Sequence, residues 1–153
     1  RAIFSEQSIL LCNACGCGKH GCLEQYSSAT GVVRCMKKLL DENPDTPCTL
    51  RGTEFAAKDV FDAARNGDAL AAREVDEMTD TLGMALANVA NTVDPEMFMI
   101  GGGVSRAGDV LFAPLREHFK VYAFKSCRET PIVPAILGND AGIYGSVRLI
   151  VGE

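Results

Sequence analysis

The stretch Cys15-Gly-Cys-Gly-Lys-His-Gly-Cys22 sets this sequence apart, because it places three of the chain's seven cysteines in one short, glycine-rich turn. A zinc ion needs about four ligands in a tetrahedron at ~2.0–2.3 Å, so the backbone must fold tightly around it. The intervening glycines allow this, because glycine adopts backbone angles that other residues avoid. The spacing therefore predicts a metal site in which Cys15, Cys17 and Cys22 supply three ligands.

The fourth ligand of this site is an open question. Cys12 lies three residues before Cys15 in a C-x-x-C arrangement and could close the site. His20 lies between two proposed ligands, where we expect its ring to point outward. The competing interpretation is a set of free or oxidised thiols around a glycine turn. If protein side chains fill every coordination position, the metal is structural, because a metal-bound nucleophilic water needs an open coordination position.

The remaining composition is that of an ordinary globular protein. The chain has 153 residues, 47% apolar and 23% charged, which predicts one domain with a real core. Its net charge is −5 and it has no basic stripe, so we expect no nucleic-acid partner. It has no run of 18 apolar residues and no signal-peptide pattern, so we expect no membrane span.

The distribution of the cysteines indicates the redox compartment. One tight cluster in an otherwise ordinary chain is typical of a metal site in a reducing compartment rather than of a disulfide scaffold. We therefore expect a cytoplasmic protein. Cys35, Cys48 and Cys127 are expected to be reduced and incidental.

Helical patterns fill the middle of the chain. Apolar positions recur every three or four residues from about residue 22 to 40, which predicts one amphipathic helix. A short helix is expected over residues 57–65 and a long one over about 69–92. Asp68 should cap the long helix, and Asp94 before a proline should end it. The second half of the long helix is apolar with small residues, so it should be deeply buried.

Two short apolar runs indicate strands. Met97–Ile100 predicts a buried strand, and Pro131–Ile136 predicts a second one near an edge because of its prolines. Between them we expect a helix that Pro114 breaks, or in which Pro114 starts a second segment ending near Ala123, and a last helix follows over residues 141–151. Two strands make a poor sheet for so many helices. Either residues 1–11 supply further strands, or the rest of the sheet lies outside this chain, which would then be a fragment.

Extended to Gly31, the cysteine stretch resembles the signature of the ROK family (repressors, open reading frames and sugar kinases), in particular its glucokinase branch. The order C-x-C-G-x-x-G-C-x-E, followed at once by Y-x-S-A-T-G, carries the resemblance. Similar family segments continue to about Val151, so nearly the whole chain is covered; they are Phe61–Ala71, Leu82–Glu96, Ile100–Ser105 and Leu137–Gly145.

The resemblance implies an α/β fold, the helix-rich C-terminal lobe of an actin-like (ribonuclease H-like) sugar kinase. Such kinases close two lobes around a sugar and ATP. Residues 1–153 would form a single domain, with residues 15–31 as the zinc and sugar motif. The family's Glu-x-Gly-His segment should fall within or before residues 1–6, which contain no histidine. Residues 1–14 therefore match poorly, and within them residues 1–11 read as a truncation junction, a cloning artefact or a divergent insertion.

The resemblance also assigns roles to residues of this chain. Glu24 matches the acidic residue that hydrogen-bonds sugar hydroxyls. From the residues alone it is equally an ordinary acidic residue of a helix's first turn. The family's zinc cysteines correspond to Cys15, Cys17 and Cys22, and its glycine turn near the nucleotide corresponds to Gly101, Gly102 and Gly103, which would otherwise be a tight strand–helix turn. The family's D-x-G-G-T turn and catalytic Asp belong to an upstream half, so no catalytic residue is expected here.

The function implied is ATP-dependent phosphorylation of glucose at its 6-hydroxyl, a step of carbohydrate metabolism and glycolysis. The expected cofactors are structural zinc, ATP and Mg²⁺, and the expected assembly is a homo-oligomer, a dimer or a tetramer. Without the upstream Asp the chain alone should be inactive. The alternatives are a sugar-sensing repressor lobe, a kinase for N-acetylhexosamine or fructose, and a zinc-stabilised packing module.

Overall fold

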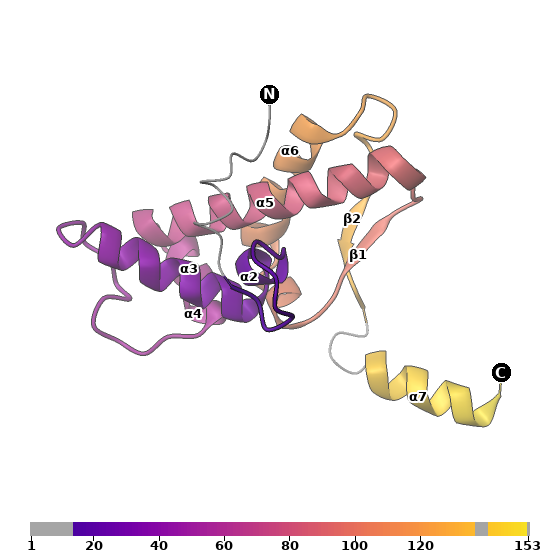
Figure 1. The fold of residues 1–153 in the computed structure, drawn as a ribbon, viewed down its shortest axis with the longest axis horizontal. Helices are drawn as coiled ribbons and strands as arrows, with labels where there is room; N and C mark the ends of the chain where they lie inside the picture. Colours follow the sequence, from indigo (N-terminus) through magenta and orange to yellow (C-terminus); the bar gives the residue numbers. More distant parts are fainter. Residues whose placement is uncertain (1–13, 137–140, 153) are drawn as a thin grey trace.

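The computed structural model describes residues 14–136 and 141–152 as a helix-rich α/β structure (Figure 1). Residues 1–11 and Cys12, on which strands and a fourth metal ligand were predicted, lie outside the described residues. In chain order the elements are α2 Glu24–Ser27, α3 Ala29–Glu42, α4 Ala57–Arg65, α5 Ala69–Val93, β1 Phe98–Ile100, the 3-10 helix η1 Gly103–Ala107, α6 Asp109–Tyr122, β2 Ile132–Pro134 and α7 Ala141–Val151.

Helix α5 is the central element of the fold. It packs against α2, α3, α4 and α6, and in Figure 1 it runs across the molecule, with α7 set apart beside the C-terminus. Gly83 lets α6 approach closely, since a Cβ there would lie 2.8 Å from the backbone nitrogen of Phe119. The largest side chains that are almost fully enclosed come from the helices and β2: Phe119, Met36, Leu111, Leu115, Ile132, Val32 and Val60.

The single helix predicted over residues 22–40 is wrong in its first part, because the structure divides it into α2 and α3. The backbone of Ser28 is extended (φ −93°, ψ 168°), and its hydroxyl accepts a hydrogen bond from the Gly31 N–H at 3.0 Å. A serine that caps the following helix competes with helix continuation at its own position. Helix α3 ends at Glu42, two residues beyond residue 40, where the predicted helical pattern ends.

The boundaries of α4 and α5 agree with the predictions. Asp68 accepts hydrogen bonds from the backbone N–H groups of Leu70 and Ala71 at 3.1 and 3.2 Å, so it caps α5 as expected. Asp94 ends α5 in the left-handed region, with φ 45°. The predicted deep burial of the second half of α5 is only partly correct. Gly83, Ala87 and Ala90 are buried, but Val89 is 47% exposed and Val93 is 64% exposed.

The two strands form a parallel pair in the described part of the chain, with Met99 of β1 opposite Val133 of β2. The prediction of a fully buried first strand is wrong, because Met97 is 50% and Met99 68% exposed. Only one face of β1 turns inward. On that face the ring of Phe98 meets Phe119 of α6 edge-on, with centroids 5.9 Å apart.

Helix α6 continues through Pro114, so the predicted break is also wrong. Proline removes one N–H from the helical ladder, and here the neighbouring turns remain anchored by Leu111, Phe112 and Leu115, which are buried in the core. Within the described residues, no helix is both long enough and apolar enough to cross a bilayer.

Candidate functional site

The predicted metal ligands come together in the structure. The Sγ atoms of Cys15, Cys17 and Cys22 all lie within 4.8 Å of one another, and those of Cys17 and Cys22 are 3.6 Å apart. Two backbone hydrogen bonds close the loop, from Cys15 N–H to the Lys19 carbonyl at 2.8 Å and from Gly18 N–H to the Cys15 carbonyl at 2.9 Å. In the same loop Gly18 and Gly21 have φ of 83° and 72°, the conformation in which glycine is favoured.

The donor atoms of this trio and the spacing of one pair are those of a candidate zinc site. Sulfur atoms held at about 2.3 Å from a tetrahedral zinc lie about 3.8 Å from one another, close to the measured pair. Hydrogen bonds from the backbone and the thiol of Cys17 lower the pKa of Cys15. Side-chain hydrogen bonds with Cys17 and then Cys15 raise the pKa of Cys22 to about 11. His20 is exposed, as predicted.

The remaining cysteines of the described residues take no part in this cluster. Cys35, Cys48 and Cys127 are free thiols, as predicted. Burial raises the pKa of Cys35 and of Cys48 above the ordinary value, which makes both thiols less reactive.

Glu24 begins the helix that leaves the cysteine loop, two residues after Cys22. Its side chain is exposed, and both carboxylate oxygens accept hydrogen bonds from the same chain. Oε2 accepts from the side-chain amide of Gln25, and Oε1 accepts from the hydroxyls of Ser28 at 3.3 Å and Thr30 at 3.4 Å. These hydrogen bonds therefore fix the orientation of the carboxylate, and the side of it that faces away from these partners is open to solvent. These partners were not predicted, although the polar Ser-Ser-Ala-Thr run after Glu24 was a visible signal.

The glycine turn Gly101, Gly102 and Gly103 follows β1 and leads into η1, whose first residue is Gly103. All three residues are exposed, and Gly102 has φ 82°, which a side chain would strain. The hydroxyl of Ser105 donates to the Gly102 carbonyl at 2.7 Å and fixes the turn.

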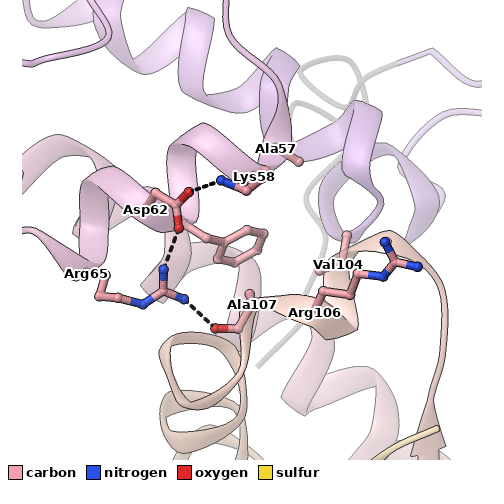
Figure 2. A pocket seen from close by; sticks show the side chains of 9 residues that line it. Ala57, Lys58, Asp62, Arg65, Val104, Arg106 and Ala107 are labelled. Atoms are coloured by element: carbon pink, nitrogen blue, oxygen red, sulfur yellow. Dashed lines mark hydrogen bonds and ion pairs between the residues drawn. The ribbon is translucent and has the colours of Figure 1, made fainter. Parts of the chain in front are cut away.

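A cavity of about 450 Å³ opens beside this turn, between α4 and η1 (Figure 2). Lys58 and Arg65 of α4 both reach the carboxylate of Asp62, and Arg65 also donates to the Ala107 carbonyl at 2.8 Å. The hydrogen bond from Lys58 lowers the pKa of Asp62, so this carboxyl stays ionised. Figure 2 shows Arg106 on the opposite wall, pointing away from this group.

The lining of the cavity has three basic side chains against one acid, which suits an anionic ligand. None of these four residues was predicted. Lys58, Asp62 and Arg65 already lie close together on α4, whereas Arg106 joins the lining only because α4 packs on η1, about forty positions later in the chain. The cavity and the glycine turn share Gly103, whereas the cysteine loop and Glu24 do not line the cavity.

Three comparisons place these features among known proteins. Residues 8–153 match the family model described as "ROK family". The chain is 43% identical over 140 residues to a glucokinase of Halalkalibacterium halodurans, covering 89% of this chain and 42% of that protein. It is 39% identical over 140 residues to a glucokinase of Thermotoga maritima, covering 89% of this chain and 44% of that protein.

Comparison with a solved structure agrees with these sequence matches. The fold superposes with a TM-score of 0.76 on a ROK family glucokinase from Streptomyces griseus, which was solved in complex with glucose and AMPPNP. That chain is 33% identical, and the match covers 89% of this chain and 46% of that one. The chain thus spans less than half the length of the relatives that it matches.

Proposed function

This chain belongs to the ROK family, and on that premise we propose that it forms the C-terminal part of an ATP-dependent glucokinase. The observation that carries the proposal is the likeness, over 89% of this chain, to a glucokinase solved with glucose and an ATP analogue. The reaction proposed is transfer of the γ-phosphate of ATP to the 6-hydroxyl of glucose. The activity is that of the complete gene product, because the relatives are more than twice as long as the matched region.

On the sugar side, we assign Glu24 to bind the hydroxyls of glucose. An ionised carboxylate accepts hydrogen bonds from hydroxyl groups, and such bonds are shorter and stronger than neutral ones. Its exposed outer side supports this role, because the bonds from Gln25, Ser28 and Thr30 leave that side open to a ligand.

Next to Glu24, we assign Cys15, Cys17 and Cys22 to structural zinc, with Cys12 as the proposed fourth ligand. Zinc bound there would supply a rigid crosslink in the loop that leads into α2. Four protein ligands leave no position for a reactive water, so the metal takes no part in the phosphoryl transfer.

On the nucleotide side, we assign the turn Gly101, Gly102 and Gly103 to the adenosine and phosphates of ATP, used as its Mg²⁺ complex. Glycines without a Cβ let a ligand approach the backbone, and nothing lies within 4 Å of a Cβ built at Gly102 or Gly103. The basic lining of the neighbouring cavity, Lys58, Arg65 and Arg106, supports a phosphate-binding role.

The proton acceptor of the reaction is proposed to lie outside this chain. A carboxylate base would take the proton of the 6-hydroxyl as that oxygen attacks the γ-phosphate, and ADP would leave. Within the described residues, Glu24 is the exposed carboxylate that we assign to the sugar. Its proposed role is to orient the sugar, not to accept the proton. The 153-residue chain alone is therefore expected to show no kinase activity.

The test is a coupled assay of glucose 6-phosphate formation by the complete gene product with glucose and Mg²⁺-ATP. We expect turnover with glucose and a large loss with Glu24→Gln. N-acetylglucosamine and fructose serve as competing substrates, and a preference for either would replace glucose in the proposal. No turnover with any hexose would refute a kinase, and turnover by the 153-residue chain alone would refute the external base.

The assembly and location of the protein stay predictions. A dimer or tetramer is expected, and light scattering of the complete gene product measures it. A cytoplasmic location is expected from the cysteine cluster, and fractionation of the source cells tests it.

A further inference from the structure

The carboxylate of Glu24 is linked to a charged residue one helix away through a single amide. The side-chain Nε2 of Gln25 donates to Glu24 Oε2, and the Oε1 of the same amide accepts from Nη1 of Arg34 on α3. The same guanidinium nitrogen also donates to the backbone carbonyl of Gln25 at 3.2 Å. Arg34, Gln25 and Glu24 therefore form a directed chain of hydrogen bonds, which we call the relay.

The chemistry of the three groups fixes the direction of the relay. A guanidinium can only donate hydrogen bonds and an ionised carboxylate can only accept them, whereas an amide does both. The amide of Gln25 must therefore turn its oxygen to Arg34 and its NH₂ to Glu24. Without Arg34, the amide loses the partner that holds this orientation and can turn its oxygen toward the carboxylate.

The packing around the relay confines it to this arrangement. Gln25 is 5% exposed, so it cannot itself reach a ligand in solvent. Gly31 brings the first turn of α3 against Gln25, because a Cβ there would lie 2.8 Å from the carbonyl carbon and oxygen of Gln25. Arg34 is exposed at its far side, so a change there removes the donor and leaves the core intact.

We infer that Gln25 and Arg34 are positioning residues for the sugar-binding carboxylate of Glu24. The inference rests on the proposed sugar role of Glu24. The relay stabilises one rotamer of Glu24, and neither Gln25 nor Arg34 touches the sugar. Since a sugar contact of this kind acts in the ground state and the transition state alike, loss of the relay raises the KM for glucose and leaves kcat unchanged.

The test compares Arg34→Met with Arg34→Lys in the complete gene product. Arg34→Met keeps the length of the side chain and removes its donors, and we expect an increase of about tenfold in the glucose KM, with kcat and the KM for ATP unchanged. Arg34→Lys restores a donor to the Gln25 amide and is expected to return the glucose KM to within about threefold of the wild type.

The matched control is Lys37→Met, which removes a positive charge from the same helix. Lys37 lies 3.9 Å from Glu54 and makes no contact with the relay, so the glucose KM should not change. Thermal melting of each variant measures whether the fold is intact, and a lower melting temperature with an unchanged glucose KM for Arg34→Met would overturn the inference.

A double-mutant comparison separates failure of the relay from failure of the proposed function. If the relay acts through Glu24, Arg34→Met adds nothing to the glucose KM in a Glu24→Gln background. An equal increase in both backgrounds shows that Arg34 acts by another route and refutes the relay alone. If Glu24→Gln itself leaves the glucose KM unchanged, the sugar role of Glu24 is refuted, and the inference fails with it.

Discussion

The carboxyl of Glu74 makes the pH dependence of stability a sharp test of the structure. Glu74 lies on α5 and is only 2% exposed. It faces a cleft of about 350 Å³ shared with Tyr26, Cys35, Glu77 and Asp80, none of which carries a positive charge. Burial, and then the charge of Glu77, raise the pKa of Glu74 from 4.5 to about 8.

The sign and size of the effect follow from that pKa. Below pH 4.5 Glu74 is protonated in both the folded and the unfolded chain, so its ionisation costs no stability. Between pH 4.5 and about 8 the unfolded chain releases the proton while the folded chain keeps it, so stability falls as the pH rises. Each pKa unit corresponds to about 1.4 kcal/mol, so the loss reaches at most about 5 kcal/mol above pH 8.

The perturbation is Glu74→Gln, which keeps the shape of the protonated side chain and cannot ionise. We expect the variant and the wild type to have similar free energies of unfolding at pH 4.5. At pH 8.5 the variant should be more stable by up to about 5 kcal/mol. Urea denaturation followed by circular dichroism measures both, and Glu42→Gln, at a surface pair with Lys38, is the control with no comparable pH dependence.

An equal pH dependence of stability in the wild type and Glu74→Gln would refute this reasoning. It would mean that the carboxyl ionises in the folded protein at its ordinary pKa. The buried environment that the structure gives to Glu74 would then be incorrect.

Three further predictions concern the cysteine loop and the helix ends. Cys22→Ser should abolish binding of zinc, measured by metal analysis of purified protein, whereas Cys35→Ser should retain it. Gly31→Ala should cost about 1–3 kcal/mol of unfolding free energy in urea, because its Cβ would lie 2.8 Å from the backbone of α2, and Gly16→Ala, with open space around it, should cost less. Asp68→Ala should lower the free energy of unfolding by about 1–2 kcal/mol at pH 7, and this deficit should shrink below pH 3.8. Burial opposes the ionisation of Asp68, but hydrogen bonds from Thr49 and Ala71 lower its pKa. An unchanged urea midpoint in the variant would contradict the capping role.

The parts of the fold that could be predicted are those with local signals. The start of α5 follows from Asp68, whose side chain satisfies backbone donors within three residues. The break at Ser28 was missed because the helical period continues across it. A serine cap and a helical repeat are then two local signals in conflict, and the close contact at Gly31 decides between them.

The candidate site divides in the same way. The cysteine trio could be predicted because its ligands lie within one short loop. The relay could not, because it depends on Arg34 folding back from α3 onto α2. The basic cavity could not either, because its two walls, α4 and η1, are brought together only by tertiary packing. Exposed Met99 was mispredicted because an apolar run does not reveal which side of a strand will be covered.

The contact at Gly83 has a consequence for natural variation in this protein. Any larger residue there would push the backbone at Phe119, and the ring of Phe119 rests on Phe98 of β1, the strand that leads into the glycine turn. A substitution at this position is therefore expected to survive only with a compensating change on α6. Variants of this chain should show paired replacements across the α5–α6 contact. An unpaired replacement of Gly83 should displace Gly101, although the replaced residue does not contact Gly101.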